Sequence, residues 1–77
     1  MNELPDMAKM EIVHRKIGMW KATLYDASLD AKVAAVVGNT RLQLRAEKSV
    51  KDAVQAMDML KEMLIALGEK PDAKPEL

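Results

Sequence analysis

Few side chains in this chain are of a type that performs chemistry, and their spacing does not suit catalysis. The chain has one histidine and no cysteine, which excludes disulfides, thiolate metal sites and multi-histidine zinc sites. His14 lies between Val13 and Arg15 and has no partner in the sequence that would make it a general base, so we interpret it as a surface residue. Gly-rich phosphate loops, nucleophile elbows and paired-carboxylate motifs are absent. We therefore predict that the chain is not an enzyme and uses neither a cofactor nor a metal.

Methionine is the most unusual feature of the composition, with seven residues among 77. Thioether sulfurs can bind soft metals, and Met57, Met59 and Met63 are closely spaced. Methionine also fills irregular gaps in helical cores. Since Met10 and Met57 fall on the apolar seam described below, we favour core filling.

Four basic residues follow one another at helical spacing in the second half of the chain. They are Arg41, Arg45, Lys48 and Lys51. On a helix they form a broad basic stripe that could contact phosphates or an acidic partner surface, such as Asp26 and Asp30 of another copy. A solvated face is the plainer interpretation, because Glu47 and Asp52 interrupt the stripe and the formal net charge is zero. On such a face we expect i,i+4 pairs within a helix, such as Glu47–Lys51 and Glu11–Arg15.

Glycine and proline divide the chain into two long helices, which we place at about 7–37 and 41–67. Asp6 is the expected N-cap of the first helix, and Gly38 its C-terminal stop. Thr40 and Gln43 fit a capping box that opens the second helix, and Gly68 ends it. The predicted organisation is a flexible N-terminus (1–6), a helical hairpin (7–68) and a disordered charged tail (69–77).

Each predicted helix carries apolar residues at alternating steps of three and four, which is the heptad pattern of helix-on-helix packing. The first helix has Met10, Val13, Ile17, Trp20, Leu24, Ala27, Ala31 and Ala34. The second has Ala46, Val50, Ala53, Met57, Leu60, Leu64 and Leu67. If the chain folds back at Gly38-Asn39, residues that face each other have numbers that add up to 77, and the seam positions of the two helices then meet one another. In this register, small residues lie near the turn and large ones at the open end. We therefore predict an all-α, antiparallel two-helix hairpin.

One alternative is a break near 26–28, where Ser28 could cap a third helix. The heptad phase runs through this segment unchanged, so we prefer one continuous helix.

Apolar residues also lie off the seam, more than a two-helix hairpin can bury. The predicted interface consists of Ile12, Met19, Leu29, Val33, Val36 and Leu44. A contiguous exposed apolar patch is unusual on a monomer. We expect these residues to pack against a second copy, giving a four-helix bundle or larger helical oligomer with a dimer favoured, or against a partner protein helix.

We accordingly predict a small structural or interaction protein, such as an adaptor, an assembly factor or a small phage-type protein. The alternative is a nucleic-acid-binding dimer that uses the basic stripe. In architecture only, such a dimer resembles the small plasmid-encoded helical hairpins that bind RNA loop pairs. No apolar run is long enough to span a membrane and no signal peptide is visible, so we expect no membrane partner and a cytoplasmic location.

Overall fold

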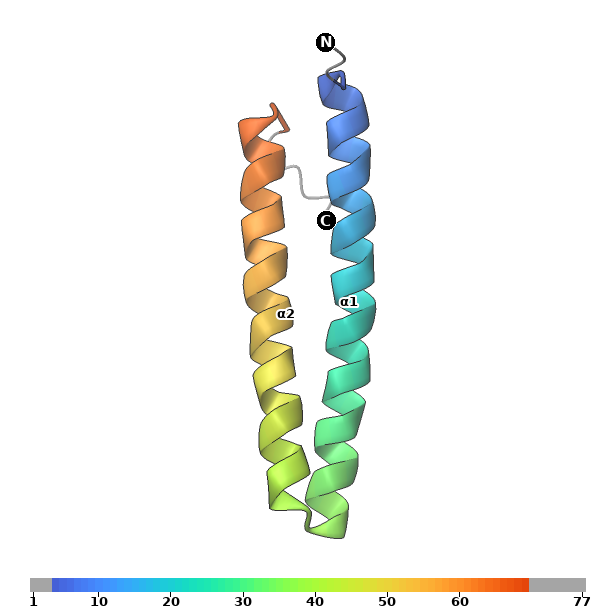
Figure 1. Ribbon diagram of the computed structural model, residues 1–77, viewed down its shortest axis with the longest axis vertical. Helices are drawn as coiled ribbons and strands as arrows, with labels where there is room; N and C mark the ends of the chain where they lie inside the picture. The colour runs from blue at the N-terminus through green and yellow to red at the C-terminus, as the bar shows by residue number, and fades with distance from the viewer. Residues whose placement is uncertain (1–3, 70–77) are drawn as a thin grey trace, which may run out of the picture.

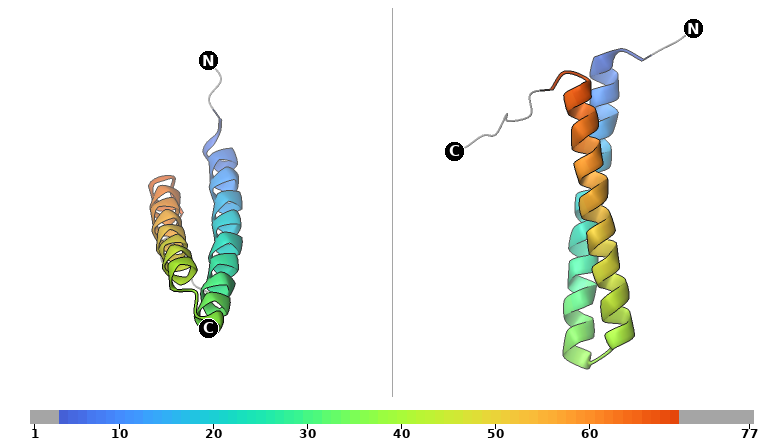
Figure 2. Two further views of the ribbon diagram at one scale, coloured as in Figure 1. Left: turned by 60° about the horizontal axis from the view of Figure 1, so that its bottom comes forward. Right: turned by 90° about the vertical axis from the view of Figure 1, so that its left-hand side faces the viewer.

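The computed structural model describes residues 4–69 and consists of two antiparallel helices. Helix α1 (Asp6–Val37) and helix α2 (Thr40–Ala66) are joined by Gly38 and Asn39 (Figure 1). At 1.5 Å per residue, α1 is about 48 Å long and α2 about 40 Å. The helices pack side by side and cross at a shallow angle (Figure 2). The predicted hairpin is therefore confirmed.

The start of α1 differs from the predicted one. Pro5 takes the extended backbone conformation of an N-cap (φ −64°, ψ 157°), and its carbonyl accepts a 3.1 Å bond from the Lys9 N–H. Asp6 is therefore the first helical residue and not the cap, and no side chain caps this end. The Asp6 carboxylate still lies in the first turn, where a negative charge interacts favourably with the helix dipole.

Helix α1 is continuous through residues 26–28, which rules out the three-helix alternative. The Ser28 hydroxyl does not cap a new helix. It donates a 2.8 Å hydrogen bond to the Leu24 carbonyl, one turn back in the same helix.

The turn between the helices is a Schellman motif, and Gly38 ends α1 as predicted. Gly38 has φ 77°, its N–H donates to the Ala35 carbonyl at 3.3 Å, and the Asn39 N–H donates to the Ala34 carbonyl at 2.9 Å. Glycine suits this position because a positive φ is costly for residues with a Cβ atom. The same pair of bonds ends α2, where Gly68 has φ 115° and donates to the Ile65 carbonyl at 3.0 Å.

The cap of α2 corrects a second prediction. Asn39, and not Thr40, is the N-cap, and its Oδ1 accepts a 3.0 Å bond from the Leu42 N–H. The predicted capping box is absent, because Thr40 is already the first helical residue; Gln43 Nε2 donates to Glu47 Oε2 at 3.2 Å. The physical reason is the brevity of the turn: Asn39 is the one residue between Gly38 and the helix, so the capping position falls on it.

The core is the predicted seam between the helices. Its most buried members are Ile17, Ala27, Ala34, Ala46, Ala53 and Leu64. The other predicted seam residues are half-buried. At the open end, Met10 Cε lies 3.8 Å from the position that a Cβ would take on Gly68, the residue next to Leu67, which the predicted register pairs with Met10. The alanine-rich part of the seam lies toward the turn, where small side chains allow the helices to approach closely.

Most of the two predicted flexible segments falls outside the described residues, which leave out 1–3 and 70–77. Within the described part, Asp6 belongs to α1. Glu69 is attached to the hairpin, since its N–H donates to the Leu64 carbonyl at 3.0 Å.

Candidate interaction surfaces

The side of α1 that faces away from α2 is apolar along most of its length. We call this surface the outer apolar face; it consists of Ile12, Met19, Leu29, Val33 and Val36. Their exposed fractions run from 36% at Ile12 to 86% at Val36. Large apolar side chains are usually buried in monomers, and a row of five that share one helix face is a candidate docking surface.

Helix α1 is apolar on two opposite sides, which explains how this face arises. The seam and the outer apolar face each repeat at alternating steps of three and four, but they lie about half a turn apart around the helix. One side packs against α2 and the other has no counterpart within residues 4–69.

Leu44 does not belong to the same surface as the other predicted interface residues. It is 62% exposed but lies on α2, at a helical position that points away from the seam. Prediction also passed over Tyr25 and Val37, each 68% exposed on α1. Tyr25 lies directly beside the outer apolar face. Because it is large and the chain has one tyrosine, its type could have identified it from the sequence as a candidate interface residue.

The four predicted basic residues, Arg41, Arg45, Lys48 and Lys51, are all exposed on α2. Lys48 Nζ lies 3.1 Å from Asp52 Oδ2, an i,i+4 pair between exposed groups that contributes little to stability. Within residues 4–69, no carboxylate lies within 4.0 Å of the other three. The predicted Glu47–Lys51 pair does not form within 4.0 Å, and Glu47 Oε2 instead accepts from Gln43 Nε2.

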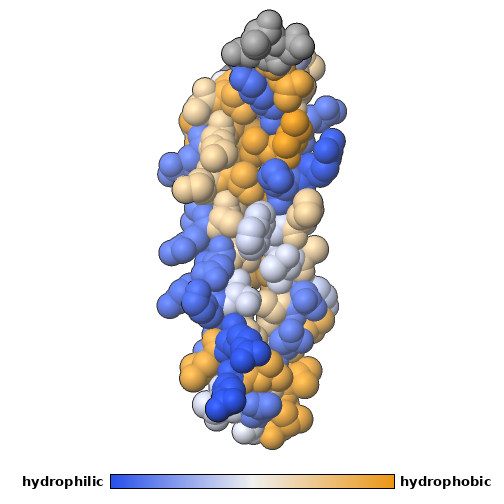
Figure 3. All heavy atoms as spheres, viewed as in Figure 1, coloured by the Kyte–Doolittle hydropathy of each residue, from blue (hydrophilic) through white to orange (hydrophobic). Residues whose placement is uncertain are grey.

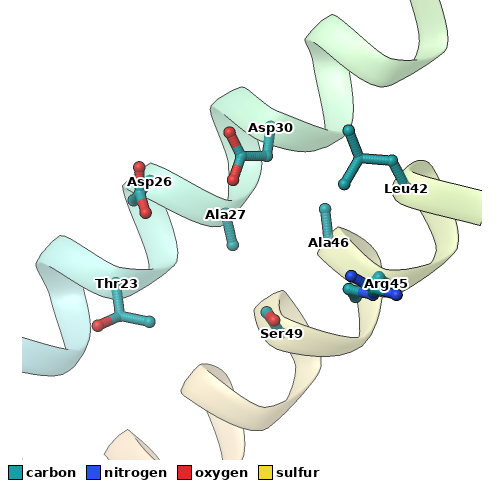
Figure 4. Close-up of a pocket in the computed structure, with 8 residues that line it drawn as sticks. All are labelled: Thr23, Asp26, Ala27, Asp30, Leu42, Arg45, Ala46 and Ser49. Carbon is teal, nitrogen blue, oxygen red and sulfur yellow. The ribbon is translucent and has the colours of Figure 1, made fainter. Parts of the chain in front are cut away.

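A shallow groove of about 150 Å³ runs between the helices near the turn (Figure 4). Ala27 and Ala46 lie between the helices at its floor, while Asp26 and Asp30 line it from α1 and Arg45 from α2. The acidic and basic residues thus occupy the same height along the hairpin, as the register predicts. No ion pair within 4.0 Å joins them among the described residues, and the groove is too small and open for a drug-sized ligand.

His14 and the methionines, the other candidate ligand residues of the sequence, lie in different surroundings. His14 Nε2 lies 2.9 Å from Glu69 Oε1, and both side chains are substantially exposed, so this contact attaches the end of α2 to α1 at the surface. Met10 and Met57 are half-buried in the seam, whereas Met59 and Met63 are exposed. Residues 4–69 hold no group of three side chains that could ligate a metal through histidine, cysteine or carboxylate atoms.

Apolar surface gathers at the two ends of the hairpin on the face seen in Figure 3, with hydrophilic surface between them. Exposed apolar residues lie at both ends of the hairpin, and others, such as Met19 and Leu29, lie between them on α1. Val36, Val37 and Leu44 lie near the turn, and Met59 and Ile65 toward the open end. Neither helix of the described region is long and apolar enough to cross a bilayer.

No family model, curated protein or solved structure matches this chain. Its surfaces are therefore the sole guide to its function. The outer apolar face of α1 carries five exposed apolar residues that α2 cannot cover, because they lie on the side of α1 opposite the seam.

Proposed function

We propose that this chain is a small interaction protein, a helical hairpin that self-associates through the outer apolar face of α1. The observation that carries the proposal is the exposure of this face: Val33 is 59% exposed, Met19 63% and Val36 86%. Covering such side chains contributes roughly 1.5–3 kcal/mol for each one fully buried. The proposal assigns the chain no catalytic role.

The thin core supports the need for a second layer. Four of the six buried residues are alanines, and none of the described residues is both large and fully buried. Each alanine removes little apolar surface from water, so the seam alone gives a modest driving force. Small domains often gain their remaining stability by oligomerising.

A second copy of this chain is the preferred partner. Closed two-fold dimers are the commonest oligomers, and each copy brings the same uncovered face. Two hairpins packed through α1 form a four-helix assembly with a second buried layer between them. Light scattering coupled to size exclusion tests this: we expect a dimer at micromolar concentration, and a chain that stays monomeric at high micromolar concentration overturns the proposal.

A nucleic-acid-binding dimer is the second candidate, and the basic stripe on α2 favours it. Arg41, Arg45 and Lys51 are exposed and have no carboxylate within 4.0 Å among residues 4–69. Guanidinium and ammonium groups in this state are available for phosphate oxygens. The pairing of Lys48 with Asp52 and the zero net charge weigh against a dedicated binder.

A binding titration with structured RNA and duplex DNA at two salt concentrations tests this second candidate. Phosphate contacts release counterions, so binding through the stripe weakens steeply as salt rises. Arg41→Glu/Lys51→Glu should abolish it, while Lys9→Glu/Lys32→Glu, which makes the same charge change on α1, should retain most of it. Absence of binding at low salt rejects the candidate.

A further inference from the structure

The outer apolar face of α1 contains two charged positions that decide how a second copy can dock on it. Arg15 and Asp26 lie on the same side of α1 as the apolar residues of this face. Together with Ile12, Met19, Leu29 and Val33 they follow the alternating steps of three and four. Both side chains are exposed. They lie 11 residues apart, or about 16 Å along the helix axis, so they cannot pair within one chain.

Neither charge is neutralised by another residue of the described hairpin. Within residues 4–69, no carboxylate lies within 4.0 Å of Arg15 and no cation within 4.0 Å of Asp26. The Glu11–Arg15 pair expected from i,i+4 spacing does not form. Arg45, the basic residue that lines the groove beside Asp26, is also beyond this distance.

From this pattern we infer that two copies pack α1 against α1 in antiparallel orientation, with facing residue numbers that add up to 41. The inference rests on the proposed self-association and specifies its geometry. In this register Arg15 of each copy faces Asp26 of the other, Ile12 faces Leu29, and Met19 faces Ala22. Farther out, Ala8 faces Val33 and Pro5 faces Val36. Every apolar position meets an apolar one, and each charge meets its opposite.

The other arrangements of the same face leave the charges unmatched. A parallel pair sets Arg15 against Arg15 and Asp26 against Asp26, which is repulsive in both layers. An antiparallel pair shifted by one heptad, with numbers that add up to 48, sets Arg15 against Val33 and Asp26 against Ala22, so each charge loses water without gaining a partner. Shifting the other way sets Arg15 against Met19 and Asp26 against Ala8.

Helix length favours the same register independently of charge. The two-fold axis of this pairing lies between residues 20 and 21, close to the middle of α1 (Asp6–Val37). The two helices therefore overlap over almost their whole length, which buries the largest part of the face. Near the axis, Ala22 is the small residue opposite Met19. Gly18 is exposed one turn before Ala22, with open space where a side chain would start.

Charge reversal tests the register, because Arg15 and Asp26 can approach each other only when they belong to different copies. Arg15→Glu and Asp26→Arg each create two repulsive layers in a homodimer, and each should raise the dimer dissociation constant by about tenfold or more in sedimentation equilibrium. The double variant Arg15→Glu/Asp26→Arg should return close to the wild-type value. Arg41→Glu and Asp58→Arg, which make the same charge changes on α2, should dimerise like wild type.

Mixing the two single variants gives a sharper measurement. In an equimolar mixture, the glutamate introduced by Arg15→Glu in one copy faces the arginine introduced by Asp26→Arg in the other. The native Arg15 and Asp26 that remain also face each other, so both layers become attractive. We expect a heterodimer of near wild-type affinity from two chains that separately dissociate. Circular dichroism of each single variant should stay helical, since both positions are exposed.

The outcomes separate this inference from the proposed function. A monomeric wild type overturns both. A dimeric wild type whose single variants keep their affinity, or whose double variant and mixture do not recover it, overturns the register while leaving self-association standing. Recovery in both the double variant and the mixture establishes the Arg15–Asp26 pairing.

Discussion

At the scale of single residues, the ends of the helices show which local interactions organise the hairpin. Asn39 takes part in both helices: its backbone N–H closes the Schellman motif of α1, and its side chain caps α2 through the Leu42 N–H. Thr40, the residue expected to cap, is instead the first residue of α2. One residue thus satisfies backbone groups at two adjacent helix ends, which would otherwise need water.

Asn39→Ala should therefore lower the free energy of unfolding by about 1 kcal/mol, the usual cost of losing an N-cap side chain. Urea unfolding followed by circular dichroism measures this. Thr40→Ala is the matched control one position along, and it should change stability much less. An equal loss in both variants would contradict the assignment of the cap to Asn39.

At the scale of the helices, the seam works because its residues change in size along the hairpin. Ala34 and Ala53 have no exposed surface, so each is enclosed by the opposing helix and its own neighbours. Ile17 and Leu64 are buried toward the open end, where larger side chains fill the seam. Enclosed alanines leave no room for extra methylene groups, because helical interiors are densely packed.

Ala53→Leu should destabilise the hairpin by about 1–3 kcal/mol through overpacking of the seam. The exposed residue Ala35 offers a control for the same chemical change, and Ala35→Leu should be close to neutral. Thermal unfolding at one protein concentration compares the two. If Ala53→Leu melted like wild type, the close approach of the helices at Ala53 would be wrong.

At the scale of the whole molecule, α1 resembles a central helix that lacks one of its two neighbours. Its seam is covered by α2, while its outer apolar face is exposed. On its far side, helix α2 presents mainly charged residues, including Arg41, Lys48 and Asp52, together with the exposed apolar residues Leu44 and Met59. Of the two helices, α1 therefore has the more continuous apolar surface opposite the seam.

Val33→Glu should convert the proposed dimer to a monomer, because it places a carboxylate in the buried layer between two α1 helices. Met59→Glu is the matched control: Met59 is 62% exposed and Val33 59%, but Met59 lies on α2. We expect light scattering to give the monomer mass for Val33→Glu and the wild-type mass for Met59→Glu. If the Val33→Glu variant remained dimeric, the interface would lie on another surface than the outer apolar face.

The sequence by itself determined the two helices, the seam and the exposed outer apolar face of α1. These follow from the heptad spacing of apolar residues and from the glycines at positions 38 and 68, which act locally or through a simple periodicity. The tertiary structure decided what depends on the exact path of the chain. It moved the cap of α2 to Asn39 because the turn is so short, and it attached Glu69 to His14 across the open end. It also left Arg15 and Asp26 without partners in the described hairpin, where local spacing had paired Arg15 with Glu11. Side-chain pairing depends on three-dimensional distance, which periodicity alone does not specify.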